Sequence, residues 1–166
     1  GLTQRGDSHG AGPVVEELRR LSASGSESDR LVASGVLLQI GQGNAGEQTI
    51  LRGGLSSKDP NQRRLAIELG DADRATLVSA LKDSDTQVRL AAAHRLAKQG
   101  HHDGADVLRT VAASGDKEGL MAYVTLRKLG EQVPPPPGLA SLLMSGDVTT
   151  RLVVLDFARD LPSAEA

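Results

Sequence analysis

The sequence contains no cysteine and no tryptophan, and a single phenylalanine and a single tyrosine bring its aromatic content to 1%. The missing cysteine excludes disulfide bonds, thiolate metal ligands and thiol catalysis. It also fits a reducing compartment, so we expect a cytoplasmic protein. With so few aromatic rings, Leu, Val, Ile and Ala must build the core, which favours closely packed helices over a β-sandwich.

Long apolar runs and an excess of one charge are missing as well. No segment reaches the roughly 20 apolar residues of a membrane-spanning helix, and no signal-peptide pattern opens the chain. We therefore expect no membrane span. Nineteen basic and twenty-one acidic side chains give a net charge of -2, so the chain lacks the overall basic field that attracts nucleic acid. Glycine is abundant, with nineteen in 166 residues, and this predicts short helices with frequent breaks.

Four of these glycines recur at a nearly constant spacing. Gly41, Gly70, Gly100 and Gly130 lie 29, 30 and 30 residues apart. An apolar helical pattern precedes each glycine, a short polar turn precedes that pattern, and a second, shorter helical pattern precedes the turn. The shorter helices are expected to begin at Pro13, Asn44, Asp73, Asp103 and, after a run of prolines, Gly138.

The repeating unit is therefore a helical hairpin of about thirty residues that occurs five times. Neither helix of a hairpin can bury its apolar stripe alone, so neighbouring hairpins must stack into a solenoid. The sequence predicts an all-α fold with one repeat domain over 13–162, a flexible lead-in at 1–12 and a short tail at 163–166. The second helices are expected to line the concave side and the first helices the convex side.

The best-preserved unit, LVSALKDSDTQVRLAAAHRLAKQG at 77–100, resembles a HEAT repeat of the short bacterial kind, which includes the HEAT-like repeats named from phycobilisome lyases. It carries a leucine-rich first helix and an Asp-containing turn, followed by Val88-Arg89, Ala91-Ala92, Leu96 and Gly100. The fourth unit departs from this pattern because Gly119 replaces the arginine, and the second helix of the second unit is short. The resemblance covers 13–162 and implies a right-handed α-solenoid of about five HEAT-like hairpins.

One position of the repeat is basic in four of the five units, and the arginines there are Arg30, Arg64, Arg89 and Arg151. A column of arginines could hold phosphates. The resemblance to HEAT-like arrays instead implies a structural ladder, in which each arginine pairs with a turn aspartate and ties one repeat to the next. The aspartates in question are Asp59, Asp85 and Asp147. We favour the ladder, because it requires the same position in every unit.

The glycine-rich stretch GQGNAG at 41–46 matches the G-x-G-x-x-G pattern of dinucleotide-binding proteins, whose glycines let a pyrophosphate approach a helix N-terminus. That pattern requires a preceding strand and a parallel sheet. The residues before it instead have helical periodicity, with Leu37 in register with Leu96. We therefore expect a loop between two repeats and no cofactor site.

Three other stretches suggest sites but have plainer explanations. The tripeptide RGD at 5–7 resembles an integrin-binding motif but lies in the expected lead-in. The run PPPP at 134–137 is expected to form polyproline II, which either docks in an aromatic groove or stiffens the link between the fourth and fifth units. A histidine-rich group could supply metal ligands, but no further ligand is placed with it, so we expect no metal site at His94, His101, His102 and Asp103.

The sequence holds no recognisable nucleophile, acid–base pair or phosphate loop, and we expect neither catalysis nor a cofactor. The function we predict is a scaffold or regulatory module that binds another protein on the exposed side of its second helices. Arginine and tyrosine are enriched at binding hot spots, although Tyr123 could simply fill space between helices. The candidate partner-binding residues are Arg63, Arg95, Lys98, Tyr123, Arg127 and Lys128.

Two alternatives stay open at this point. A nucleic-acid-binding or DNA-repair protein is one, but the basic column is broken and aromatic side chains that could stack on bases are almost absent. A chromophore lyase is the other, and only the name of the repeat family suggests it.

Overall fold

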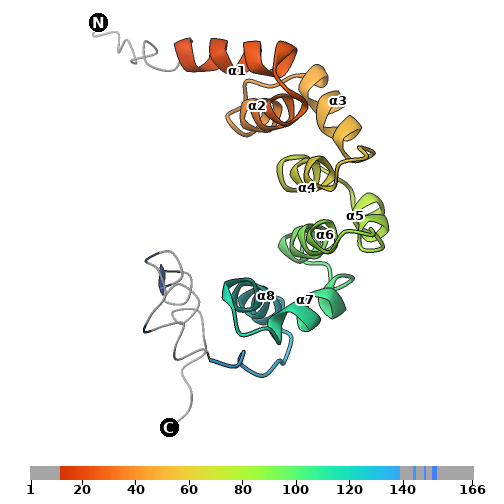
Figure 1. The fold of residues 1–166 in the computed structure, drawn as a ribbon, viewed down its shortest axis with the longest axis vertical. Coiled ribbons are helices and arrows are strands. Elements are labelled where there is room, and N and C mark those ends of the chain that lie inside the picture. The colour runs from red at the N-terminus through yellow and green to blue at the C-terminus, as the bar shows by residue number, and fades with distance from the viewer. Residues whose placement is uncertain (1–11, 139–143, 145–147, 149–150, 153–166) are drawn as a thin grey trace, which may run out of the picture. The chain divides into compact units, whose positions relative to one another are not determined.

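The computed structural model describes residues 12–138, 144, 148 and 151–152. Every regular element within them is an α-helix, which confirms the all-α prediction (Figure 1). None of the described helices combines the length and the apolar character needed to cross a membrane. Most of the predicted fifth hairpin, the RGD tripeptide and the predicted tail lie outside the described residues.

The chain divides into two compact units, residues 1–76 and 77–166. The first unit contains α1 (Gly12–Ser24), α2 (Glu27–Gln39), α3 (Ala45–Gly54) and α4 (Pro60–Leu69). The boundary falls within α5 (Arg74–Ala80), and the second unit continues with α6 (Thr86–Lys98), α7 (Ala105–Ala112) and α8 (Lys117–Lys128). Within the two units, α1 contacts α2, α3 contacts α4 and α7 contacts α8.

Each second helix begins at a polar side chain in the turn before it. Ser26, Asp59, Asp85 and Asp116 each accept a hydrogen bond from a main-chain N–H in the first turn of the helix that follows. These N–H groups have no partner inside the helix, so the cap supplies one. In α4 a proline follows the cap, at the position where a missing N–H costs nothing.

The starts of the first helices were predicted with mixed success. Asn44 caps α3, the helix expected to begin there, and forms a capping box with Glu47, in which each side chain accepts from the other's main-chain N–H. The prediction that Asp103 caps α7 is wrong, because Gly104 is the N-cap residue and makes no side-chain hydrogen bond. A Cβ added at Gly104 would lie 2.6 Å from the Cα of Ala93. Glycine therefore occupies this position so that α7 can approach α6 closely.

Three of the four repeating glycines end their helices in the same way. Gly41, Gly100 and Gly130 have φ angles of 72, 79 and 82°, in the left-handed region that glycine enters without strain. The N–H of Gly100 donates to the carbonyl of Ala97 at 2.9 Å, and the next N–H donates to the carbonyl of Leu96 at 2.9 Å. The same pair of bonds follows α2 and α8. This is the Schellman ending, which gives partners to carbonyls that the helix itself leaves unpaired.

Gly70 holds the same place in the repeat for a different reason. Its φ is −83°, a value open to any residue. A Cβ there would lie 2.6 Å from the carbonyl oxygen of Ala66. Space, and not backbone conformation, therefore requires this glycine.

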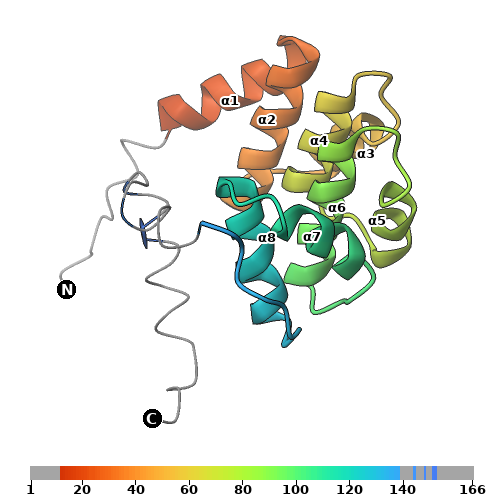
Figure 2. The same cartoon turned by 60° about the horizontal axis from the view of Figure 1, so that its bottom comes forward.

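The cores of the two units consist of small and aliphatic side chains. In unit 1, Leu31 of α2, Leu51 of α3 and Ala66 of α4 form a buried cluster. In unit 2, where α6, α7 and α8 all contact one another (Figure 2), the buried cluster is Leu90, Ala93, Ala105, Leu108, Ala112, Ala122 and Leu126. Alanines at the helix crossings let the backbones approach, as a sequence with 1% aromatic residues requires.

Candidate functional site

Arg89, in the best-preserved unit of the arginine column, contacts main-chain carbonyls and not the predicted carboxylate. Nη1 of Arg89 donates to the carbonyls of Asp83 at 2.7 Å and Ser84 at 2.9 Å, and Nη2 donates to the hydroxyl of Thr86 at 2.8 Å. The carboxylate of Asp85 instead accepts from the main chain at the start of α6. The predicted pairing of Arg89 with a turn aspartate is therefore wrong. The guanidinium closes the turn of its own hairpin.

In the second hairpin the matching residue is Arg63. Nη1 of Arg63 donates to the carbonyls of Ser57 at 2.9 Å and Lys58 at 3.2 Å, whereas Arg64 pairs with Glu68 on its own helix at 2.7 Å. Arg63 follows the N-cap of its helix by four residues, as Arg89 does. The register of the column was thus wrong by one residue in this hairpin, where Arg63 and not Arg64 bonds to the turn. The cap Asp59 sets the register.

The first and last members of the column make related contacts. Nε of Arg30 donates to the carbonyl of Ser22 at 3.2 Å, and Nη2 of Arg151 donates to the carbonyl of Met144 at 3.4 Å. The third predicted aspartate, Asp147, lies outside the described residues. We call Arg30, Arg63 and Arg89 the turn arginines, since each lies four residues after its N-cap. Arg63 and Arg89 bond to the turn before their helix, and Arg30 bonds to the last turn of α1.

Two of the predicted partner-binding residues, Tyr123 and Arg127, contact other residues of unit 2. Tyr123 is half-buried and packs against the core cluster of unit 2, as in the space-filling alternative. Arg127 is also half-buried, and its Nη1 donates to Oε1 of Gln132 at 2.9 Å just after α8 ends. Both side chains are therefore only partly accessible to a partner.

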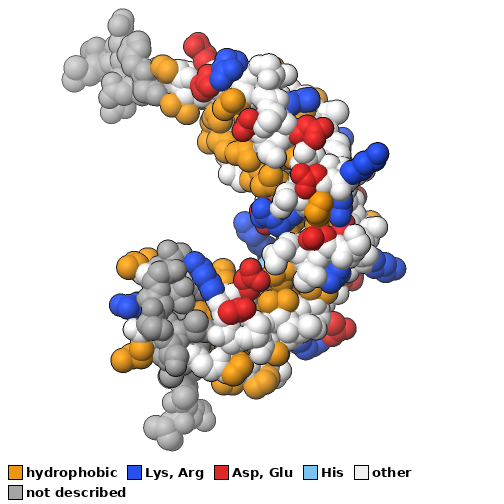
Figure 3. Space-filling model, in the orientation of Figure 1, with side chains coloured by type: hydrophobic (Ala, Val, Ile, Leu, Met, Phe, Trp, Pro, Cys, Tyr) orange, Lys and Arg blue, Asp and Glu red, His pale blue; other side chains and the backbone are white. Residues whose placement is uncertain are grey.

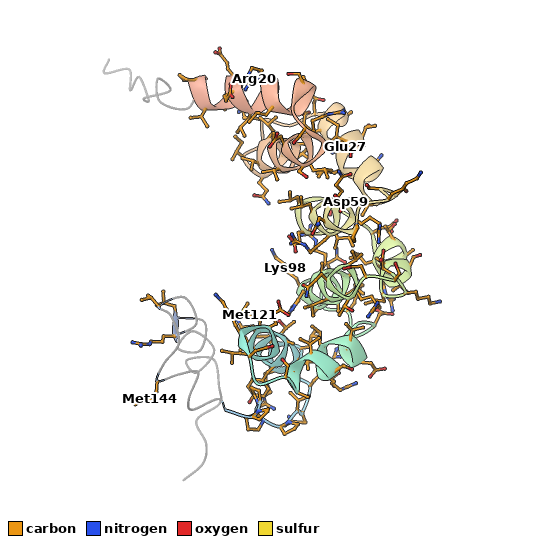
Figure 4. The ribbon with its side chains drawn as sticks, in the orientation of Figure 1. Arg20, Glu27, Asp59, Lys98, Met121 and Met144 are labelled. Carbon is orange, nitrogen blue, oxygen red and sulfur yellow. The ribbon has the colours of Figure 1, made fainter. Side chains whose placement is uncertain are left out.

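The remaining predicted residues share one side of unit 2 with a methionine that the sequence analysis did not single out. Lys98 of α6 and Lys128 of α8 are exposed, Arg95 is half-exposed, and Met121 is 39% exposed. Figure 4 shows Lys98 and Met121 on the side of α6 and α8 away from α7. The spacing agrees, because residues 121 and 128, like 95 and 98, lie on one side of their helix. We call Arg95, Lys98, Met121 and Lys128 the α6–α8 face.

A hydrogen bond joins the two helices beneath this face. Nδ1 of His94 and Oγ1 of Thr125 lie 3.0 Å apart. The Thr125 hydroxyl donates its single hydrogen to the carbonyl of Met121 at 2.8 Å, so the imidazole Nδ1–H must be the donor to it. This bond joins α6 directly to α8.

The histidine-rich group is divided among separate contacts. His94 bonds across to α8, whereas Nδ1 of His102 lies 2.7 Å from Oε1 of Glu131. In the described parts of the chain, no three histidine, aspartate or glutamate side chains are grouped as a metal ion requires.

Glu131, which follows the end of α8, contacts two basic side chains. Its carboxylate accepts hydrogen bonds from His102 and from Nη2 of Arg109. Nη1 of Arg109 pairs with Asp106 at 2.7 Å. The hydrogen bond from His102, followed by that from Arg109, holds the pKa of Glu131 below its ordinary range. The pKa of Arg109 is raised in turn, chiefly by its bond to Glu131. These exposed pairs fasten α7 to the segment that leaves α8.

The glycine-rich stretch 41–46 lies between two helices, as predicted. Gly41 ends α2 and Gly46 lies in the first turn of α3. The element before the motif is a helix, so the strand that a dinucleotide site requires is not there.

The four prolines form no helix and line a groove of about 320 Å³ with Arg109, Ala112 and Val133. Pro136 is buried and the other three are exposed. The run therefore rests against α7.

One feature of unit 1 has no counterpart in the sequence analysis. A cleft of about 350 Å³ lies among α2, α3 and the start of α4. The buried amide of Gln62 forms part of its wall, where it donates to Glu27 at 2.6 Å and accepts from Ser57 at 2.6 Å. Its polar residues come from three separate segments, so no local sequence pattern could reveal it.

Comparison with known proteins gives this chain no relatives. No protein-family model matches it, and neither a curated protein nor a solved structure shows significant similarity to it.

Proposed function

We propose that the chain is a protein-interaction module built of HEAT-like hairpins, stacked as a right-handed solenoid, without catalysis or a cofactor of its own. The support is the thirty-residue period, the recurring cap, turn arginine and glycine ending, and the order of paired helices. Neighbouring repeats of this kind form an extended surface from equivalent helices, and such surfaces serve binding.

The α6–α8 face is the part of that surface that we propose binds the partner. The observation that carries the proposal is that Lys98, Lys128 and Met121 are exposed, and Arg95 half-exposed, on two second helices that a hydrogen bond joins. Methionine adapts its shape to different apolar partners, and cations at the rim steer and orient an acidic one. The partner is therefore a protein segment with acidic side chains around an apolar anchor.

Charge reversal tests this assignment. We expect the variant Arg95→Glu, Lys98→Glu and Lys128→Glu to keep the helical circular dichroism of the wild type and to lose the proteins that the wild type captures from its native host. A matched control changes the same charge elsewhere with Arg19→Glu, Arg52→Glu and Lys82→Glu, all exposed. If the control loses capture and the α6–α8 variant retains it, the surface has been assigned to the wrong side.

The same variants address the nucleic-acid alternative. Phosphate binding by this face would appear as retention on duplex DNA that weakens steeply with salt and disappears on charge reversal. We favour a protein partner, because the face carries a methionine and no aromatic side chain. No feature of the described residues favours the chromophore lyase.

A further inference from the structure

The cleft among α2, α3 and the start of α4 has the size and the lining of a site for a small molecule. Its volume of about 350 Å³ lies at the lower end of the range for ligand pockets, which is about 300 to 1,000 Å³. Charged, polar and apolar side chains line it, and all of them belong to unit 1. Figure 3 shows acidic and basic side chains intermixed over these helices. We call this space the unit 1 cleft.

A glycine keeps the unit 1 cleft open, although glycine weakens the helix that contains it. Gly53 lies within α3, where alanine would be more favourable. Its φ angle is not positive, and a Cβ added there would meet no atom within 4 Å. At the neighbouring Gly54, by contrast, a Cβ would lie 2.6 Å from Cδ2 of Leu31. Neither backbone conformation nor close packing therefore requires Gly53, whereas the space beside it belongs to the cleft.

Arg30 brings to the cleft a guanidinium with unpaired nitrogens. The corresponding Arg63 and Arg89 each donate from Nη1 to two carbonyls of the turn before their helix. The turn before α2 is shorter than those before α4 and α6, and Arg30 instead donates from Nε to the carbonyl of Ser22 in α1. Among the described residues, Nη1 and Nη2 of Arg30 have no partner. These two nitrogens can therefore bind a carboxylate of a ligand.

Glu27 brings the opposite charge from one turn earlier on the same helix. Its Oε2 accepts from the buried amide of Gln62 at 2.6 Å, which holds the carboxylate toward the start of α4 (Figure 4). Side chains three residues apart on a helix are neighbours, with Cβ atoms about 5 to 6 Å apart. In the described structure Glu27 and Arg30 nevertheless form no ion pair, because Gln62 and Ser22 hold them separately. The cleft thus presents a carboxylate and a guanidinium next to each other.

We propose that the unit 1 cleft binds a free amino acid with an aliphatic side chain. A free amino acid carries its carboxylate and its ammonium group on one carbon atom, so that Arg30 binds the first and Glu27 the second. A simple anion would lie beside Glu27 and a simple cation beside Arg30, and like charges so close together repel. Leu31 and Ile50 line the same cleft and offer the apolar surface for the ligand's side chain.

Isothermal titration calorimetry with L-leucine, L-isoleucine and L-valine, each added separately, tests the proposal. We expect at least one of them to bind saturably, one molecule per chain, with a dissociation constant below about 1 mM. The amide of the tightest binder lacks the carboxylate, and its N-acetyl derivative lacks the ammonium group. Each should bind at least tenfold more weakly than the free amino acid. Because these derivatives imitate the first and last residues of a peptide, they also distinguish a free amino acid from a peptide end.

Three variants relate this binding to the unit 1 cleft. Glu27→Gln keeps an acceptor for Gln62 but loses the charge, and Arg30→Gln loses the guanidinium, so each should weaken binding at least tenfold. Gly53→Leu should fill the open space and abolish binding while the helical circular dichroism stays that of the wild type. Arg52→Gln is the matched control, because Arg52 is exposed on the same helix as Gly53 but does not line the cleft, and it should bind as the wild type does.

Two kinds of result would overturn the proposal. One is a wild type that binds none of the three amino acids saturably, or that binds the amide or the N-acetyl derivative as tightly as the free amino acid. The other is binding that survives both Glu27→Gln and Gly53→Leu in folded protein, since the ligand would then lie outside the unit 1 cleft.

Discussion

Replacing Gly35 by alanine is expected to destabilise unit 1, although alanine is the better helix former. Gly35 lies within α2, where an alanine gains about 1 kcal/mol of helix propensity. Its new methyl group would lie 2.7 Å from the Cβ of Leu69 and 3.2 Å from two further atoms of that side chain. Carbon atoms pack best at about 3.5 to 4.0 Å, so α2 and α4 must move apart.

The size of the effect follows from these opposing contributions. Forcing an extra methyl group into a packed contact costs about 1 to 3 kcal/mol, and the Cβ of Leu69 cannot move aside without its backbone. Subtracting the gain in propensity leaves a net loss of about 1 kcal/mol. Gly53 in α3 is a matched control, since it is exposed and a Cβ there meets no atom within 4 Å. Gly53→Ala should therefore stabilise by about 0.5 kcal/mol.

Urea unfolding followed by circular dichroism at 222 nm measures both variants, and hydrogen exchange of the α2 and α4 amides localises the change. We expect a lower midpoint for Gly35→Ala than for the wild type and a higher one for Gly53→Ala. Equal or reversed midpoints would show that α4 does not pack on α2 as described.

Three further substitutions test the local contacts of the hairpins. Arg89→Ala should lower the free energy of unfolding by about 1 kcal/mol, because the carbonyls of Asp83 and Ser84 lose their donor. Lys82→Ala, a control at an exposed position just before these residues, should change the free energy of unfolding by less than about 0.5 kcal/mol. Equal losses in the two variants would contradict the role of the turn arginine. Gly130→Ala should lower the free energy of unfolding, measured by thermal unfolding, by about 1 kcal/mol, because φ is 82° there. Gly130→Asn should lower it by less. No loss of stability in either variant would argue against the Schellman ending. The depressed pKa of Glu131 means that its carboxylate stabilises the fold above the ordinary glutamate pKa, and that this contribution is lost as pH falls through the lowered pKa. Glu131→Gln should therefore flatten the acid side of a plot of stability against pH, and an unchanged acid side would refute this.

The helical fold and most helix ends could be predicted because their causes lie within a few residues. A cap such as Asp85 bonds to the next turn of its own chain, and a glycine such as Gly100 adopts a conformation that other residues avoid. Both leave a mark in the sequence at a fixed place. Asp103 was misassigned because the choice of Gly104 as the cap depends on the approach of α7 to Ala93, a contact between helices.

The candidate site was predicted less completely for the same reason. Two adjacent arginines, Arg63 and Arg64, cannot be told apart by a repeat period that varies by a residue, and only the position of the cap separates them. Met121 was missed because a methionine in a helix has the same local pattern whether it is buried or exposed. Its position beside Lys98 depends on the packing of α6 against α8, which no single repeat encodes.

The turn arginines also bear on how the chain folds. Each bond that they make to a main-chain carbonyl spans five to eight residues of chain, so closing that loop costs little conformational entropy. The packing of Leu69 beside Gly35, by contrast, joins residues 34 positions apart. Folding that begins with the cheapest loops therefore begins inside individual hairpins, and stacking follows. A chain still emerging from the ribosome can accordingly complete one hairpin before the next has been synthesised.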